Sequence, residues 1–320
     1  MHAGRKSLSE KQMQGELFED RSMPAAETAP VTPAPVARRD AVELCVLGSG
    51  SSGNCTVLRV GGRVMLLDAG FGPVTTARRL QQAGVRFADV QAICVTHLDA
   101  DHFRPHWPRT LLGFGVPVYL HRWLLEPFSR LEGGPEMIAA DLARPFDDAP
   151  FSPVDGIEAH PIHLAHDRKG TTGFRLRTVH GDVGYATDLG RVPGRLIEHF
   201  AGIDLLAIEC NYDPGMQLNS ARPVFLKKRI MGGSGHLSNE QAFDAVRRID
   251  ARSPTGRPAH VVLLHRSRQC NTPQRVREVF AQNPAIARRI VLSEQRRRSA
   301  WLRITGGGSS GTARQMAWAF

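Results

Sequence analysis

Short apolar runs recur along this chain, and four of them lead directly into histidine or aspartate. Runs of this length predict buried strands. The four segments that combine such a run with candidate ligands are 90–102, 162–167, 183–188 and 261–265. A strand end lies where the dry core meets an open cleft, so imidazoles and carboxylates there are candidate metal ligands. Solvated turns with helix-capping histidines are the alternative, but the repetition favours a metal site.

The remaining pattern alternates strands with helices. A helix is expected at 75–84, where alanine and leucine recur at helical spacing. A hairpin is expected at 174–187, around a turn at Gly181-Asp182. The other expected elements are strands at 117–120 and 203–209 and helices at 122–128, at 239–249 and from 271 onward. Two mixed sheets that face each other, with helices outside, satisfy this order.

The segment 48–53, Gly-Ser-Gly-Ser-Ser-Gly, matches the G-x-G-x-x-G fingerprint of dinucleotide-binding proteins. That fingerprint needs a helix directly after it, because the helix N-terminus receives the pyrophosphate. A β-branched run at 55–60 follows instead, and Gly61-Gly62 then turns the chain into an apolar run at 64–67. This order predicts a hairpin, so no nicotinamide cofactor is expected.

Both ends of the chain differ in composition from the rest. Residues 1–40 are rich in alanine, proline and charge, and such a segment buries too little apolar surface to offset its ordering entropy. We therefore expect a disordered arm there, one catalytic domain at 41–305 and a flexible glycine- and serine-rich tail at 306–320. Within the arm, Gln14-Gly15-Glu16-Leu17-Phe18 resembles the peptide with which bacterial replication and repair proteins bind the sliding clamp.

The densest group of candidate ligands is His97-Leu98-Asp99-Ala100-Asp101-His102. It resembles a variant of the metallo-β-lactamase superfamily signature, His-x-His-x-Asp-His. Six further segments resemble the YycJ (WalJ)-like branch, which is related to the nuclease members of that superfamily: 48–54, 67–70, 187–190, 209–213, 235–239 and 265–267. The similarity extends over about residues 42–304. It implies the metallo-β-lactamase fold, an α+β protein built as an αββα four-layer sandwich.

The resemblance also implies two divalent metal ions. The implied ligands of one ion are His97, Asp99 and His166, and those of the second ion are Asp101, His102 and His265. Asp188 is implied to bridge both ions. The chain departs from the superfamily pattern at Asp99, where a second histidine is usual. Because a carboxylate is a harder ligand than imidazole, Zn²⁺ is expected with Mn²⁺ as the alternative. His160 and His163 are substitutes for His166, which is preferred because Asp167 follows it as in the family.

Hydrolysis is the reaction that such a metal pair implies, since two divalent ions activate water and polarise the bond under attack. The leaving oxygen needs a proton, and His236 lies in a Gly-His-Leu-Ser-Asn run that resembles the catalytic motif of the tRNase Z nucleases. We expect Glu209 to orient His236, and Asp101 and Asp188 to complete the catalytic set. The ordinary alternatives are a loop histidine before a helix and a carboxylate that ties down a loop.

The net charge favours a polyanionic partner. Lysine and arginine total 41 against 31 acidic residues, a net charge of +10. Such an excess is typical of proteins that contact nucleic-acid phosphates, although an arginine-rich genome would produce it too. One cluster has six arginines at 288–303, and a second, in an expected loop before His236, comprises Arg222, Lys227, Lys228 and Arg229. Neither cluster shows clear aromatic interleaving, so a stacking platform for unpaired bases is not expected.

Cysteine usage and hydropathy bear on the compartment. The five cysteines are odd in number and show no Cys-x-x-Cys spacing, which argues against a disulfide framework. No apolar stretch is long enough to span a bilayer, and the N-terminus lacks the apolar region of a signal peptide. A cytoplasmic location without membrane association is therefore expected.

These features together predict a two-metal phosphodiesterase that acts on DNA or RNA. The first alternative is a small-molecule hydrolase of the same fold, with a cyclic phosphodiester, a lactone or a thioester as substrate. The second is a non-catalytic relic of the fold that binds nucleic acid or a protein partner. The unusual Asp99 favours this last alternative, because it weakens the expected metal site.

Overall fold

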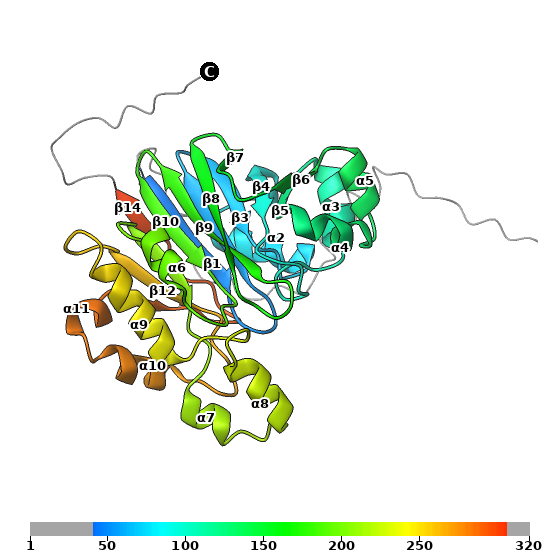
Figure 1. Cartoon of the computed structure of the whole chain (residues 1–320). Coiled ribbons are helices and arrows are strands. Elements are labelled where there is room, and N and C mark those ends of the chain that lie inside the picture. The colour runs from blue at the N-terminus through cyan, green and yellow to red at the C-terminus, as the bar shows by residue number, and fades with distance from the viewer. Residues whose placement is uncertain (1–40, 306–320) are drawn as a thin grey trace, which may run out of the picture.

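Two seven-stranded sheets face each other in the computed structural model, which describes residues 41–305 (Figure 1). The first sheet has its strands in the order β14 (Leu302–Thr305), β1 (Ala41–Gly48), β2 (Cys55–Val60), β3 (Arg63–Leu67), β4 (Val90–Cys94), β5 (Val118–His121) and β6 (Ala143–Phe146). Strands β14 to β3 are antiparallel neighbours, whereas β3 to β6 run parallel. The sheet is therefore mixed, as expected.

The second sheet is mixed in the same way. Its order is β13 (Ile290–Leu292), β12 (His260–Leu264), β11 (Leu205–Glu209), β10 (Gly181–Ala186), β9 (Thr171–Thr178), β8 (Ile157–Leu164) and β7 (Phe151–Val154). Strands β10 to β13 run parallel, and β7 to β10 are antiparallel.

Helices cover the outer face of each sheet. The helices of the first half of the chain are α2 (Pro73–Gln82), α3 (Trp107–Phe114), α4 (Leu125–Ser129) and α5 (Gly134–Ala139), with short 3-10 turns at Phe87–Asp89 and Arg122–Leu124. Those of the second half are α6 (Gly194–His199), α7 (Pro214–Leu218), α8 (Val224–Met231), α9 (Asn239–Asp250), α10 (Pro273–Phe280) and α11 (Pro284–Ala287).

Three apolar clusters each lie between two neighbouring layers, so the sandwich has four layers. One cluster joins the first sheet to α2 and α3, and includes Leu80 and Trp107. A second lies between the sheets, where Leu58 and Phe174 are both fully buried. The third joins the second sheet to α6, α9 and α10. The expected αββα sandwich is confirmed.

Local details differ from the sequence-based expectations in two places. The β9–β10 turn lies at Val179-His180 rather than at Gly181-Asp182, because both expected turn residues are paired within the ladder. The expected helix at 122–128 is a 3-10 turn followed by the short α4. The glycine-rich segment 48–53 leads into β2, which pairs with β3 in the hairpin expected from the sequence.

All five cysteines lie in the described part of the chain, and each is buried and free. Among the residues described, no helix has the length and apolar character that crossing a membrane requires. The expected arm at 1–40, its clamp-like peptide Gln14–Phe18 and the expected tail at 306–320 lie outside the described residues.

The topology gathers several strand ends into one region. Strands β3 and β4 are parallel neighbours, and so are β10, β11 and β12. Parallel strands end at the same edge of a sheet, where ligands bind in open α/β sheets. The polar residues at or just after these five ends are Asp68, His97, Asp188, Glu209 and His265.

Candidate metal centre

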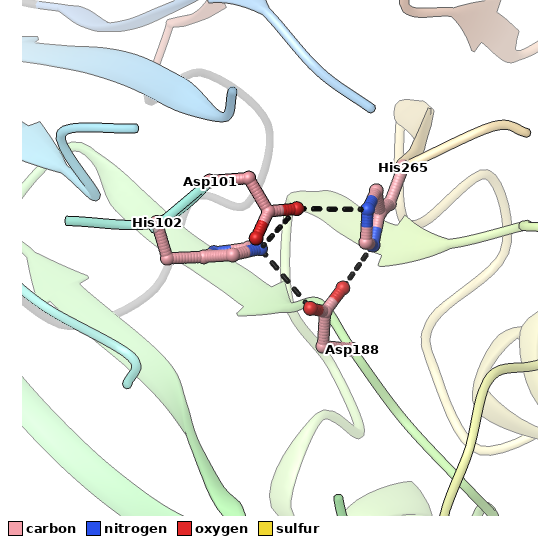
Figure 2. A group of neighbouring side chains, drawn as sticks. All are labelled: Asp101, His102, Asp188 and His265. Carbon is pink, nitrogen blue, oxygen red and sulfur yellow. Dashed lines mark ion pairs between the residues drawn. The ribbon is translucent and has the colours of Figure 1, made fainter. Parts of the chain in front are cut away.

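Side chains from six chain segments converge at this edge. Three groups, two of which share Asp188 and His265, have ligand atoms close enough to hold a metal ion, within 4.8 Å of one another in each group. The groups are His97, Asp99 and His166; Asp101, His102, Asp188 and His265; and Asp188, Glu209, His236 and His265. Figure 2 shows the second group, in which the side chains point toward a common centre. Every metal ligand expected from the sequence is therefore present in the cluster.

Asp188 lies at the middle of the cluster. Its Oδ2 atom is 3.1 Å from His102 Nε2, 3.3 Å from His97 Nε2 and 3.7 Å from His166 Nε2. Its Oδ1 atom contacts His265 Nδ1. One carboxylate thus touches histidines of both expected ligand sets, which is the geometry that a shared ligand requires.

The two other aspartates of the motif lie near different histidines of the cluster. Asp101 Oδ2 is 3.5 Å from His265 Nε2 and 3.8 Å from His102 Nε2. Asp99 Oδ2 is 3.8 Å from His97 Nε2, and 58% of its side chain is exposed, against 23% for Asp101. Asp99 is the most solvent-accessible member of the expected ligand sets.

Hydrogen bonds hold the Nδ1 atoms of two cluster histidines and leave their Nε2 atoms facing the cluster. Asp68 is fully buried and accepts a 2.8 Å bond from His102 Nδ1. His166 Nδ1 donates to the carbonyl of Gly235 at 3.2 Å. This arrangement is typical of metal-binding histidines, because the second partner fixes the tautomer and the ring orientation.

Several buried nitrogens of the cluster lack a hydrogen-bond partner. They are His97 Nε2 and both ring nitrogens of His265, which lie beside carboxylate oxygens of Asp188 and Asp101 without making a hydrogen bond to them. Leaving a buried polar atom unpaired costs free energy that a bound ion would recover. Imidazole nitrogens together with carboxylate oxygens are suitable donors for Zn²⁺ and for Mn²⁺. The residues present therefore fit divalent metal ions, as the fold family implies.

The backbone is strained at the same place. Five non-glycine residues of the described chain have a left-handed backbone, and four of them, Asp68, Asp167, Asp188 and His265, lie in or beside the cluster. Their φ angles lie between 40° and 61°. Such conformations cost free energy and concentrate at functional sites, where the surrounding structure enforces them.

A buried carboxylate connects the cluster to His236. Glu209 Oε1 is 2.7 Å from His236 Nδ1, and Glu209 Oε2 accepts bonds from the backbone N–H groups of Leu189 at 2.7 Å and Leu237 at 3.2 Å. Glu209 therefore both orients the histidine and ties down two loops. The two roles, alternatives in the sequence analysis, occur together.

The charges within the cluster shift its pKa values. Burial alone would raise the pKa of Asp188, but the adjacent His265 and His102 outweigh it and hold the pKa well below its usual range. Burial would likewise lower the pKa of His236, yet the Glu209 carboxylate outweighs it, so that the pKa lies above its usual value. Perturbed pairs of this kind are typical of functional sites.

The two substitutes for His166 lie elsewhere. His160 Nε2 pairs with Glu158 at 2.7 Å on β8. His163 packs against Trp123, with ring centroids 4.5 Å apart, and lines a separate cavity of about 480 Å³.

Asp68, Ser49 and Asn54 were given no role from the sequence. Ser49 Oγ accepts a 2.8 Å bond from the His265 backbone N–H, and Asn54 Nδ2 is 2.9 Å from His102 Nε2. The available signal was membership of the segments 48–54 and 67–70 in the superfamily pattern.

A cavity of about 370 Å³ opens onto the cluster. Asp99, Asp101, Asp188, His236 and His265 line one side of it. Arg222, Leu226, Arg229 and Ile230 line another. The basic residues at 227–229 lie on helix α8 rather than in the expected loop. None of the six arginines at 288–303 lines this cavity in the described structure.

Two curated relatives match most of the chain. Exodeoxyribonuclease YycJ of Bacillus anthracis is 27% identical over 244 residues, which cover 74% of this chain and 87% of the relative. Exodeoxyribonuclease WalJ of Streptococcus pneumoniae is 25% identical over 229 residues, which cover 71% of this chain and 82% of the relative.

A solved structure and a family model agree with the fold. The metallo-beta-lactamase fold protein YhfI from Bacillus subtilis superposes with a TM-score of 0.61 at 15% identity, covering 82% of this chain and 100% of that one. The family model described as "Beta-lactamase superfamily domain" matches residues 63–265, more than half of the chain. With this fold and this cluster of histidines and aspartates, the protein belongs to the beta-lactamase superfamily.

Proposed function

We propose that this protein is a metal-dependent phosphodiesterase that removes nucleotides from an end of DNA. The observation that carries the proposal is the convergence on Asp188 of four histidines, with the His236–Glu209 pair beside them and arginines across the same cavity. The names of the two curated relatives, both exodeoxyribonucleases, support DNA as the substrate and an end as the point of attack.

The proposed cofactor is a pair of divalent ions, Zn²⁺ with Mn²⁺ as the alternative. The proposed ligands are His97, Asp99 and His166 for one ion, Asp101, His102 and His265 for the other, and Asp188 for both. When bound, such ions lower the pKa of water and polarise a phosphoryl oxygen. Asp101 and Asp188 would therefore act by holding the ions, whose positive charge would stabilise the reacting phosphate.

The proton for the leaving oxygen comes from His236 in this proposal. Its Nδ1 is occupied by Glu209, and the imidazole lines the cavity with 21% of its side chain exposed. The opposite ring nitrogen is thus free to donate toward a bound substrate. Arg222, whose guanidinium bonds only to amide oxygens of Gln217 and Gln269 among the described residues, is available for a phosphate. Residues 41–305 form the proposed catalytic unit.

The experiment joins metal analysis to cleavage of end-labelled DNA by an Asp188→Asn variant. We expect it to lose bound metal and to cleave more than about 100-fold more slowly, because Lewis-acid stabilisation is worth several kcal/mol. Asp204→Asn is a matched control: Asp204 is a buried aspartate before β11 that accepts a bond from the Asp182 backbone. This control should retain metal and activity.

The outcomes separate this proposal from its two competitors. A small-molecule hydrolase would turn over lactones or thioesters while leaving DNA intact, and such a result would refute the nuclease proposal. A non-catalytic relic would bind less than one ion per chain and cleave neither class of substrate. Release of mononucleotides from one end, dependent on added Zn²⁺ or Mn²⁺, is the expected result.

A further inference from the structure

Residues 213–235, here called the α7–α8 lobe, leave the sandwich after β11 and return before α9. Figure 1 shows α7 and α8 standing apart from the two sheets. A small apolar cluster packs Ile230 of the lobe against Tyr212 and Cys270, which lie outside it. Asp213 caps α7 by accepting a 2.7 Å bond from the Met216 backbone N–H.

The lobe forms one wall of the cavity that opens onto the metal cluster. Arg229 of α8 pairs with Asp167, the residue after His166, and the Asp167 backbone N–H donates to the Ser234 carbonyl at 2.7 Å. Arg222 is held by Gln269 at 3.1 Å and 3.2 Å. A molecule whose phosphate reaches the cluster therefore passes beside α8.

The lobe exposes apolar side chains beside this cavity wall. Phe225 is 73% exposed, Val224 68% and Leu218 58%, so that three of the eight large hydrophobic residues exposed in the described chain lie on this lobe. Single exposed hydrophobic residues are ordinary, whereas a group of them beside a polar cleft marks a binding surface. Phe225 is the aromatic member of this group.

The charge of the lobe identifies the kind of partner. Its segment contains four basic residues, Arg222, Lys227, Lys228 and Arg229, and a single acid, Asp213, which is used as a helix cap. Arg229 pairs with Asp167, but in the part of the chain that the structure describes no acid pairs with the other three. Cations without an acidic partner in the same short segment as an exposed aromatic ring fit a polyanion that carries planar groups.

We propose that Phe225 stacks on a base of single-stranded DNA while Arg222 and Lys228 bind the phosphates that flank it. This inference rests on the proposed function and adds a subsite to it, for the nucleotide next to the one at the metal cluster. Aromatic side chains within a basic groove are the usual platform for unpaired bases, because every base has a stacking face. No such platform was expected from the sequence; the 73% exposure of Phe225, in the same segment as these cations, changes that interpretation.

The test compares wild type with Phe225→Ala on two strands. The first probe, the complete strand, is a fluorescent single-stranded oligonucleotide with phosphorothioate linkages that resist cleavage. The second probe, the abasic strand, is the same single strand with abasic sites in place of the bases near its end. We expect Phe225→Ala to weaken binding to the complete strand about tenfold, the effect of losing one stacked base. Binding to the abasic strand should change less than about twofold. Phe225→Trp should restore the wild-type affinity for the complete strand, because tryptophan also stacks on bases.

Val179 provides a matched control. It is also 73% exposed, but it lies in the β9–β10 turn, at the opposite end of β10 from Asp188. Val179→Ala should bind both strands like wild type. Equal affinity of wild type and Phe225→Ala for the complete strand overturns the inference, as does an equal loss on both strands. A change in sedimentation with Phe225→Ala would instead assign the surface to a second copy of the chain.

The failure of this inference differs from a failure of the proposed function. If wild type cleaves DNA and Phe225→Ala binds equally well, only the subsite is wrong. If wild type neither binds nor cleaves the same oligonucleotide with ordinary phosphodiester linkages, the proposed function fails and the subsite fails with it.

Discussion

Glu209 Oε1 lies 2.7 Å from His236 Nδ1, and the same carboxylate holds the backbone N–H of Leu189, the residue after Asp188. Glu209 is fully buried at the end of β11. One side chain therefore fixes both the proposed proton donor and the aspartate at the centre of the cluster. Movement of either loop would break a hydrogen bond to a buried charge, which is costly.

His236→Ala is expected to lower kcat by about 10²–10⁴-fold on DNA, the usual contribution of general acid–base catalysis, while metal content stays unchanged. The decisive measurement uses a nucleotide p-nitrophenyl ester, whose leaving group departs without a proton. On that substrate the variant should lose far less activity. An equal loss on DNA and on the nitrophenyl ester would show that His236 positions the phosphate instead.

Asp68→Asn is expected to weaken metal binding by about 10–100-fold, because Asp68 accepts the Nδ1–H of His102 and so orients its Nε2. Competition with a chelator, followed by elemental analysis, measures this change. Glu43→Gln is the control, since Glu43 is also a buried carboxylate but pairs with Arg59 and Arg303 on neighbouring strands. A similar metal loss in both variants would point to general destabilisation.

Much of the fold could be predicted from local patterns. The apolar runs at 90–95 and 261–264 became β4 and β12, and the α9 helix begins after Ser238, which caps it together with Gln241. Each of these signals lies within a few residues of sequence. The spacing of the strand ends along the chain could not prove that they converge, because convergence depends on how two sheets pack.

The supporting residues were harder to predict for the same reason. Asp68 and His102 are 34 positions apart, and Ser49 and His265 are 216 apart, so no local pattern joins them. A Cβ on Gly70 would overlap the carbonyl of Asp101, a close approach that only the folded backbone reveals. The 73% exposure of Phe225 could not be predicted either, because it is set by the packing of the lobe and not by its neighbours in sequence.

Asp99 predicts a difference between the two proposed metal sites. Its side chain is 58% exposed and 3.8 Å from His97 Nε2, and a short carboxylate replaces the imidazole that is usual in the superfamily. Increasing chelator should therefore remove one ion before the other. Asp99→His should bring the two steps together and raise the preference for Zn²⁺, since imidazole is the softer ligand.

The control for this change is Asp141→His, which adds a histidine at an aspartate with 90% of its side chain exposed and far from the cluster in sequence. It should leave both steps of metal release unchanged. Release of both metal ions in a single step from wild type would contradict a weak site at Asp99. The same shift in metal release in both variants would contradict it too.

The five cysteines provide a test of the sandwich that does not depend on activity. All are buried, and burial raises the pKa of the Cys55, Cys94 and Cys210 thiols. The thiolate is the reactive form, so a higher pKa leaves less of it at a given pH. At pH 8, a disulfide reagent should find no fast-reacting thiol in the native protein and five after unfolding in guanidinium. A thiol that reacts within seconds before unfolding would place a cysteine outside the core, and fewer than five afterwards would reveal a disulfide that the structure does not contain.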